Sequence, residues 1–91
     1  MSVVVRIPTQ LRTLSGGDAE VKVDGADVGA ALADLEAKHP GFQGRLFDED
    51  GKLRRFVNVF VADEDVRFLD GLDTPLSEGQ VVSIIPAVAG G

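Results

Sequence analysis

Apolar and polar residues alternate in two short stretches near the start of the sequence. The first predicts a strand over residues 2–8, because every second side chain is apolar and these side chains share one face. The second predicts a strand over residues 20–23 after a glycine-rich turn. The two strands are expected to form an antiparallel hairpin, with residues 9–14 as an extended connection. Their apolar positions are Val3, Val5, Ile7, Val21 and Val23.

The apolar spacing then changes to that of a helix. Asp27 is the expected N-cap, because its carboxylate can accept hydrogen bonds from the free N–H groups of the first turn. Pro40 and Gly41 are expected to stop the helix, and His39 in its last turn is expected to have a structural role. The apolar residues at i, i+3, i+4 and i+7 are Val28, Ala31, Leu32 and Leu35.

The second half of the sequence predicts three more strands with irregular segments between them. The strands cover residues 56–61, 66–68 and 80–85, of which the first has the clearest alternation. Residues 41–55 are expected to be irregular, and residues 72–76 fit a short helical turn or loop. The core side chains of these segments should be Phe42, Leu46, Phe47, Val57, Val59, Val61, Leu72, Leu76, Val82 and Ile84.

This order of elements predicts an α+β fold in which a mixed sheet of four to five strands packs on one helix. The first and last strands are the most continuously apolar, so they are expected to pair in parallel at the centre of the sheet. This is the ubiquitin-like β-grasp arrangement. Residues 1–86 are expected to form the domain, with residues 87–91 as a flexible C-terminal tail.

Composition narrows the possible functions. A net charge of −6 argues against nucleic-acid binding, since nucleic-acid binders are typically basic. The chain has no cysteine, which excludes disulfides and any thiol chemistry of its own, and a single histidine excludes a Cys/His metal cluster. No segment has the pattern of a membrane span or a signal peptide, so a cytoplasmic location is expected.

The last six residues suggest a function for the chain's end. A predicted strand leads into small residues, and Gly90 and Gly91 close the sequence. Glycine lacks a Cβ, so such a tail can enter a channel that is too narrow for side chains. We therefore expect the Gly91 carboxylate to be the reactive group, and the preceding residues Ala87, Val88, Ala89 and Gly90 to contact a partner. The alternative is an inert end, since chain termini often hold small residues and are poorly ordered.

A body surface is needed to hold such a partner, because ordering the tail costs about 1–2 kcal/mol per residue. Phe60 and Ile85 are the candidates, since each lies opposite its strand's main apolar face. Val81 and Ile85 are both expected to be partly exposed, because Ser83 marks that face as the solvent side. The alternative is that Phe60 only covers the sheet edge or is buried by a loop.

Three blocks of sequence carry a resemblance to a known family. VADEDV (61–66), LSEGQV (76–81) and IIPAVAGG (84–91) are similar to the blocks VNGxxV, LxDGDxV and PPVxGG of the ThiS/MoaD sulfur-carrier proteins, and most of all to the actinobacterial carriers of cysteine biosynthesis. The chain departs from these blocks at Ala62, Gln80 and Ala87, which replace Asn, Asp and Pro. The terminal glycines match.

The resemblance implies a sulfur carrier that is a protein co-substrate and not an enzyme. An E1-like enzyme would use ATP to adenylate the Gly91 carboxylate, which sulfur would then convert into a thiocarboxylate. The chain itself would bind no cofactor or metal. The sulfur acceptor would be a pyridoxal-phosphate-dependent cysteine synthase using O-phosphoserine, after which a JAMM-type zinc protease would release cysteine. Delivery to thiamine, molybdopterin or a secondary metabolite, protein modification as by ubiquitin, and a plain interaction domain remain open alternatives.

Overall fold

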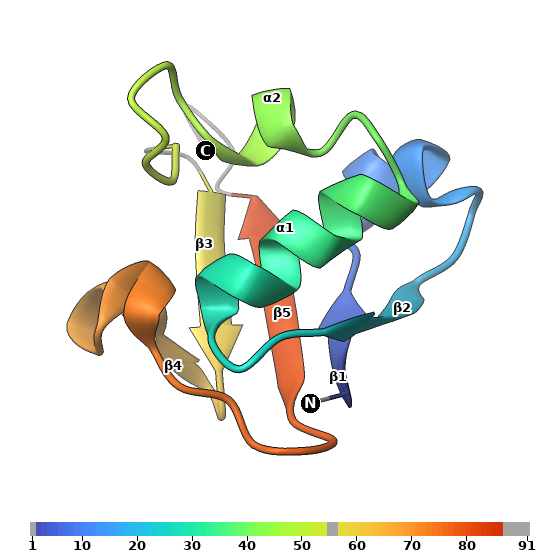
Figure 1. Ribbon diagram of the computed structural model, residues 1–91. Helices are drawn as coiled ribbons and strands as arrows, with labels where there is room; N and C mark the ends of the chain where they lie inside the picture. The colour runs from blue at the N-terminus through green and yellow to red at the C-terminus, as the bar shows by residue number, and fades with distance from the viewer. Residues whose placement is uncertain (1, 55–56, 87–91) are drawn as a thin grey trace.

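A computed structural model describes residues 2–54 and 57–86 of the chain. These residues form a mixed five-stranded sheet with a helix across one face, which confirms the predicted α+β fold (Figure 1). Only the central pair, β1 and β5, is parallel, and the other neighbours are antiparallel. The strands in spatial order are β2 (Glu20–Asp24), β1 (Ser2–Arg6), β5 (Val81–Pro86), β3 (Val57–Val61) and β4 (Glu64–Asp65).

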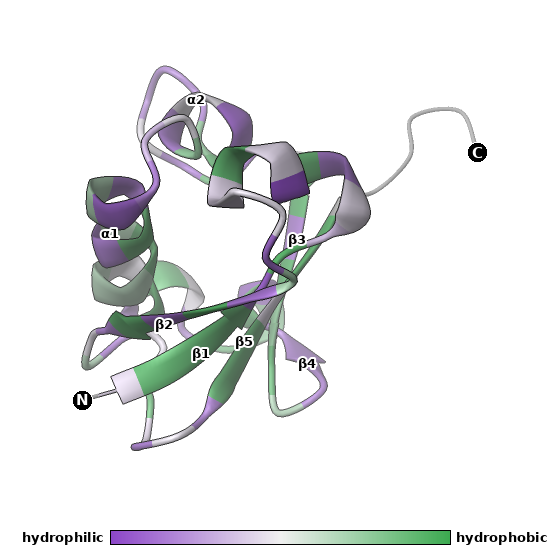
Figure 2. Ribbon diagram, turned by 90° about the vertical axis from the view of Figure 1, so that its right-hand side faces the viewer, coloured by the Kyte–Doolittle hydropathy of each residue, from purple (hydrophilic) through white to green (hydrophobic). Residues whose placement is uncertain are grey.

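The parallel pair lies at the centre because both strands bury apolar side chains. Val5 of β1 stands beside Val82 of β5, and both are fully buried. In Figure 2 the two strands run side by side and are coloured mostly as hydrophobic. The predicted parallel pairing of the first and last strands is therefore confirmed. β1 starts at the predicted residue and ends two residues earlier than predicted, and β5 is shifted by one residue at both ends.

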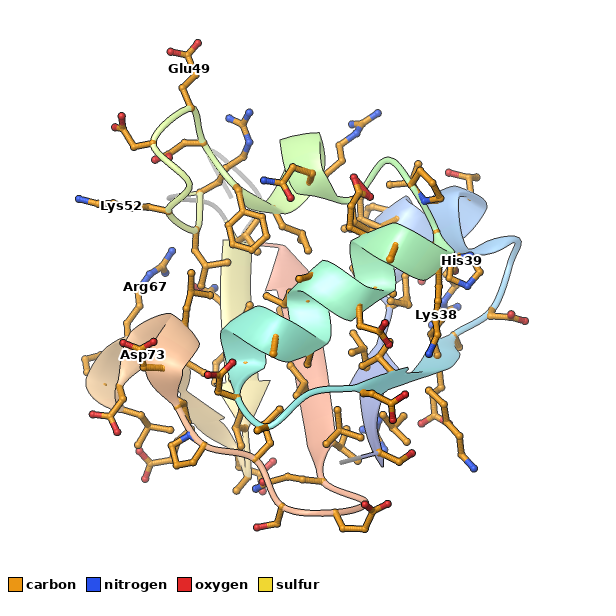
Figure 3. All side chains as sticks on the ribbon, in the orientation of Figure 1. Lys38, His39, Glu49, Lys52, Arg67 and Asp73 are labelled. Atoms are coloured by element: carbon orange, nitrogen blue, oxygen red, sulfur yellow. The ribbon has the colours of Figure 1, made fainter. Side chains whose placement is uncertain are left out.

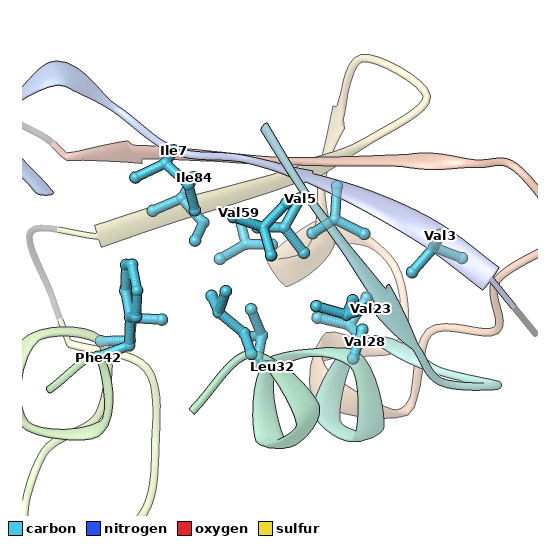
Figure 4. Close-up of a cluster of buried hydrophobic side chains, with 14 of the residues drawn as sticks. Val3, Val5, Ile7, Val23, Val28, Leu32, Phe42, Val59 and Ile84 are labelled. Atoms are coloured by element: carbon cyan, nitrogen blue, oxygen red, sulfur yellow. The ribbon is translucent and has the colours of Figure 1, made fainter. Parts of the chain in front are cut away.

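The helix α1 (Val28–Lys38) closes the core from one side of the sheet (Figure 4). It starts where predicted, because Asp27 Oδ1 accepts a hydrogen bond of 2.7 Å from the Ala30 N–H. It ends at Lys38, and the His39 N–H closes the last turn on the Leu35 carbonyl at 2.8 Å. The buried side chains of α1 are Val28, Ala31, Leu32 and Leu35, which is the predicted apolar face.

One predicted connection is wrong. Residues 9–14 were expected to be extended, but the 3₁₀ helix η1 (Thr9–Ser15) occupies this segment. Leu11 is buried and Leu14, three residues later, packs against the core, so the spacing of the leucines follows a helical period. Ser15 Oγ lies 2.7 Å from the Asp18 carbonyl, which fixes the end of this turn.

The predicted strand over residues 66–68 is also wrong. The short strand is β4 (Glu64–Asp65), and the 3₁₀ helix η2 (Val66–Phe68) follows it. Ala62 and Asp63 have φ angles of 53° and 67°, so they form a tight turn that lets pairing with β3 begin at Glu64. Asp65 Oδ1 then accepts a hydrogen bond from the Arg67 N–H at 2.9 Å, which turns the chain into η2.

The segment of residues 41–54 was expected to be irregular, but it contains one short helix. The short helix α2 (Gln43–Leu46) lies over one end of the core, where Phe42 and Leu46 are fully buried and Phe47 is half-buried. Their predicted role as a cover is confirmed. The 3₁₀ helix η3 (Gly71–Asp73) overlaps the start of the turn or loop predicted over residues 72–76. Residue 56, the first of the predicted third strand, lies outside the described residues.

Candidate functional site: the sheet edge that precedes the C-terminal residues

The strand β5 ends at the same edge of the sheet as β1, because these two strands are parallel. Its last residue, Pro86, pairs with Val57, the first residue of β3. The predicted reactive residue Gly91 and the predicted contacts at residues 87–90 lie outside the described residues. The structure therefore describes the strand that leads to the predicted tail, and the roles of residues 87–91 stay predictions.

Phe60 and Ile85 lie on the face of the sheet that is turned away from α1. Ile85 is 47% exposed and its neighbour Ile84 only 3%, so the predicted facing of β5 is confirmed. Val81 on the same face is half-buried, as is Phe60. Phe60 pairs with Ser83, two residues before Ile85 in β5, which makes the two apolar side chains diagonal neighbours. Their binding role stays a prediction.

Two residues that share these hollows with Phe60 and Ile85 were missed by sequence reasoning. Arg6 and Ser83 are direct partners across the parallel pair, and both line two neighbouring hollows. The hollow at Ile85 has a volume of about 440 Å³, and the hollow at Phe60 about 300 Å³. Arg6 also forms an exposed ion pair with Glu20, with 3.3 Å between Nε and Oε2. The surface thus combines two apolar side chains with the polar residues Arg6 and Ser83.

The guanidinium of Arg67 binds the chain segment beside the C-terminal end of β5. Its Nη2 donates hydrogen bonds to the carbonyls of Arg54 at 2.8 Å and Val57 at 2.9 Å. Its Nη1 donates to Asn58 Oδ1 at 2.8 Å. Figure 3 shows this side chain pointing from η2 toward the start of β3. Arg67 therefore fixes the start of β3, the strand beside the last residues of β5.

The shifted pKa values lie elsewhere in the molecule. The pKa of Asp34 is lowered, chiefly because its carboxylate accepts a hydrogen bond from the Asp24 N–H at 2.8 Å and also because it pairs with Lys38 at 2.9 Å. The pKa of Lys38 is raised by the hydrogen bond to Asp34. These groups tie α1 to β2 and line neither hollow.

Within residues 2–54 and 57–86, no three side chains of His, Cys, Asp or Glu gather in a group that could hold a metal ion. None of the described helices has the length and apolar character needed to cross a bilayer.

Comparisons with known proteins cover nearly the whole chain. The model of the ThiS family matches residues 5–91. The sulfur carrier protein CysO of Mycobacterium tuberculosis is 52% identical over 93 residues, which cover all of both chains. A chain in the crystal structure of the Amycolatopsis orientalis BexX/CysO complex superposes with a TM-score of 0.91 at 49% identity, over 98% of this chain and 99% of that one. Small archaeal modifier protein 3 of Haloferax volcanii is 47% identical over 68 residues, which are 75% of this chain and 73% of the relative.

Proposed function

The chain belongs to the ThiS family, and on this basis we propose that it is a sulfur carrier that serves cysteine biosynthesis through its C-terminal carboxylate. The observation that carries the proposal is the ThiS family match over residues 5–91, which includes the terminal Gly90-Gly91. It is supported by the identity of 52% with CysO over the full chain. The fold supports it, since the strand that leads to these residues is held at the centre of the sheet. From Pro86 the last five residues reach at most about 18 Å when fully extended.

The chemistry needs an activating enzyme because a carboxylate is a poor acyl donor. In the proposed reaction, a carboxylate oxygen of Gly91 attacks the α-phosphorus of ATP, so that an acyl-adenylate forms and pyrophosphate leaves. Hydrosulfide then attacks the acyl carbon and expels AMP, so that the terminus becomes a thiocarboxylate. An E1-like enzyme supplies the catalytic groups for both steps. The chain itself is a co-substrate and contributes only its terminus and its docking surface.

The proposed acceptor is a pyridoxal-phosphate-dependent cysteine synthase that uses O-phosphoserine. The thiocarboxylate sulfur displaces phosphate from an activated serine, and the resulting adduct yields cysteine when a JAMM-type zinc protease cleaves it from the carrier. All of these partners would act in the cytoplasm. The related carriers of the thiamine and molybdopterin pathways, and a carrier for a secondary metabolite, differ only in the acceptor.

A second candidate function is protein modification. The identity of 47% with small archaeal modifier protein 3 favours it, because that relative is named as a protein modifier. In this case the same acyl-adenylate of Gly91 is attacked by a lysine amine, directly or after transfer to a thiol. The product is an isopeptide bond instead of a thiocarboxylate.

The first prediction concerns the reaction itself. Incubation with ATP, a sulfide source and the cognate E1-like enzyme should replace one terminal oxygen by sulfur, because adenylation turns the carboxylate into a good acyl donor. Intact-protein mass spectrometry should show this mass gain, and fragmentation should place it on the last residue. Omission of ATP is the control. No gain with an enzyme that forms the acyl-adenylate would argue against a carrier, and isopeptide conjugates in its place would favour the modifier.

The second prediction concerns the body surface. Phe60→Ala and Ile85→Ala should each weaken binding to the activating enzyme by about tenfold. Truncation of an apolar side chain at a docking surface removes contacts, and a loss of about 1.4 kcal/mol of binding free energy corresponds to this factor. Ile84→Ala is the matched control in β5, because truncation of this buried side chain should lower the free energy of unfolding by about 2–5 kcal/mol. Titration calorimetry and thermal unfolding of each variant separate the two effects. Equal destabilisation by both isoleucine variants would show that Ile85 is a core residue.

A further inference from the structure

A third hollow lies along the edge strand β4 and the helix η2. We call it the distal groove; its volume is about 610 Å³, and it is lined by Val61, Ala62, Glu64, Phe68, Leu69 and Asp70 among others. Phe68 is 83% exposed and Leu69 42%, and both are among the few large apolar side chains that the described residues leave open to solvent. Neither contributes to the core, so their exposure needs another explanation.

The backbone on both sides of Phe68 is held in place. Asp65 caps η2 through the Arg67 N–H, and the Leu69 N–H donates to the Val66 carbonyl at 2.9 Å. Val66 is fully buried, and the Arg67 guanidinium makes two hydrogen bonds to the start of β3 and one to the Arg54 carbonyl. An exposed aromatic side chain on such a fixed support loses little conformational freedom on binding. This is the property of an anchor residue at a protein interface.

The charge around the distal groove indicates the kind of partner. Residues 61–80 contain six carboxylates and one basic residue, Arg67, which gives this stretch a net charge of −5 out of −6 for the whole chain. The Arg67 guanidinium is hydrogen-bonded to the carbonyls of Arg54 and Val57 and does not line the groove. A second copy of the chain would bring the same negative charge to the contact. A basic segment of another protein is therefore the complementary occupant.

The distal groove is continuous with the surface at Phe60 and Ile85. It shares Ala62 and Gln80 with the hollow at Phe60. That hollow in turn shares Arg6 and Ser83 with the hollow at Ile85. One partner seated on the predicted docking face can therefore extend into the distal groove without leaving the surface of the protein.

From these observations we infer that the distal groove binds a basic segment of the activating enzyme, with an apolar side chain of that segment packed against Phe68. The inference rests on the proposed function, because it takes the partner to be the enzyme that activates Gly91. The contact lies beside β4, away from the end of β5 that precedes residues 87–91. Its contribution should therefore be the same whether or not the terminus has entered the active site.

Phe68→Ser tests the anchor. The variant should fold normally because the side chain is exposed, and it should bind the activating enzyme about tenfold or more weakly in titration calorimetry. The same loss should appear in a chain that lacks Gly91. In the thiocarboxylation assay the variant should raise KM and leave kcat unchanged. Binding of Phe68→Ser with the wild-type affinity would overturn the inference.

Matched charge variants test the nature of the partner. Glu64→Gln with Asp70→Asn removes two carboxylates of the distal groove, whereas Glu49→Gln with Asp50→Asn removes two exposed carboxylates from a turn outside it. Both pairs change the net charge equally. Only the groove pair should weaken binding and reduce its dependence on salt. Equal effects of the two pairs would contradict a local basic contact.

The readouts distinguish this inference from the proposed function. If the wild-type chain binds the enzyme but gains no sulfur, the proposed carrier function fails, while the affinities of the Phe68 and charge variants still decide the role of the groove. If the wild-type chain gains sulfur and Phe68→Ser does so with an unchanged KM, the carrier function stands and the groove inference fails.

Discussion

Removal of Gly91 should abolish thiocarboxylate formation and leave the fold unchanged. The deletion withdraws the reacting carboxylate by one residue, about 3.5 Å, and a displacement of even 1 Å can cost about a hundredfold in rate. Residues 2–54 and 57–86 form the whole described core without this residue, so the melting temperature should not move. Intact mass after reaction with ATP, a sulfide source and the activating enzyme measures the first effect, and thermal unfolding the second.

Gly91→Ala is the control that separates the length of the tail from the width of the channel that it must enter. It restores the length of the chain but adds a methyl group beside the reacting carbon. A channel that admits only glycine should slow this variant without affecting its binding to the enzyme. Sulfur incorporation by the deletion variant at the wild-type rate would mean that the Gly91 carboxylate is not the reactive group, and the carrier proposal would then fail.

Phe42→Ala should give the largest loss of stability. Phe42 is fully buried where the chain enters α2, and it is among the largest of the fully buried side chains (Figure 4). Its truncation should reduce the free energy of unfolding by about 3–5 kcal/mol, because it removes apolar contacts and leaves a cavity. A domain of this size has about 5–13 kcal/mol in total. Urea unfolding followed by circular dichroism measures the change.

Phe68→Ala is the matched control, because the same atoms are removed from a side chain that is 83% exposed. It should change the free energy of unfolding by less than about 0.5 kcal/mol. The contrast also checks the assignment of the two aromatic residues to core and surface. Comparable losses in the two variants would mean that Phe68 is packed in solution and unavailable to a partner.

Most of the fold follows from the periodicity of the sequence. The alternation of Val57, Val59 and Val61 and the helical spacing of the apolar residues of α1 are strong local signals, and both proved correct. The 3₁₀ helices η1 and η2 were missed because segments of three to seven residues hold too few apolar positions to distinguish a period of two from a period of three. The turn at Ala62 and Asp63 was also missed, because both residues have positive φ angles although neither is a glycine, the residue that usually marks such a turn in a sequence.

The candidate site was predictable only where it depends on the facing of one strand. Ile85 and Phe60 were found because each opposes the buried side of its own strand. Arg6 and Ser83 were missed because they meet across the parallel pair of strands that are most distant in the sequence, so that no local pattern links them. A prediction that combined the parallel register with the polar positions of both strands would have placed them together.

The central position of β5 has a mechanical consequence. A partner that pulls on the C-terminal residues loads this strand along its length, between β1 on one side and β3 on the other. The inter-strand hydrogen bonds lie across the direction of pull, so many must break at once in shear instead of one by one as in peeling. Resistance to forced unfolding depends on the unfolding rate, which such a geometry lowers. Traction on the terminus should therefore move residues 2–54 and 57–86 as a rigid body, as the proposed transfer of the terminus between enzymes would require.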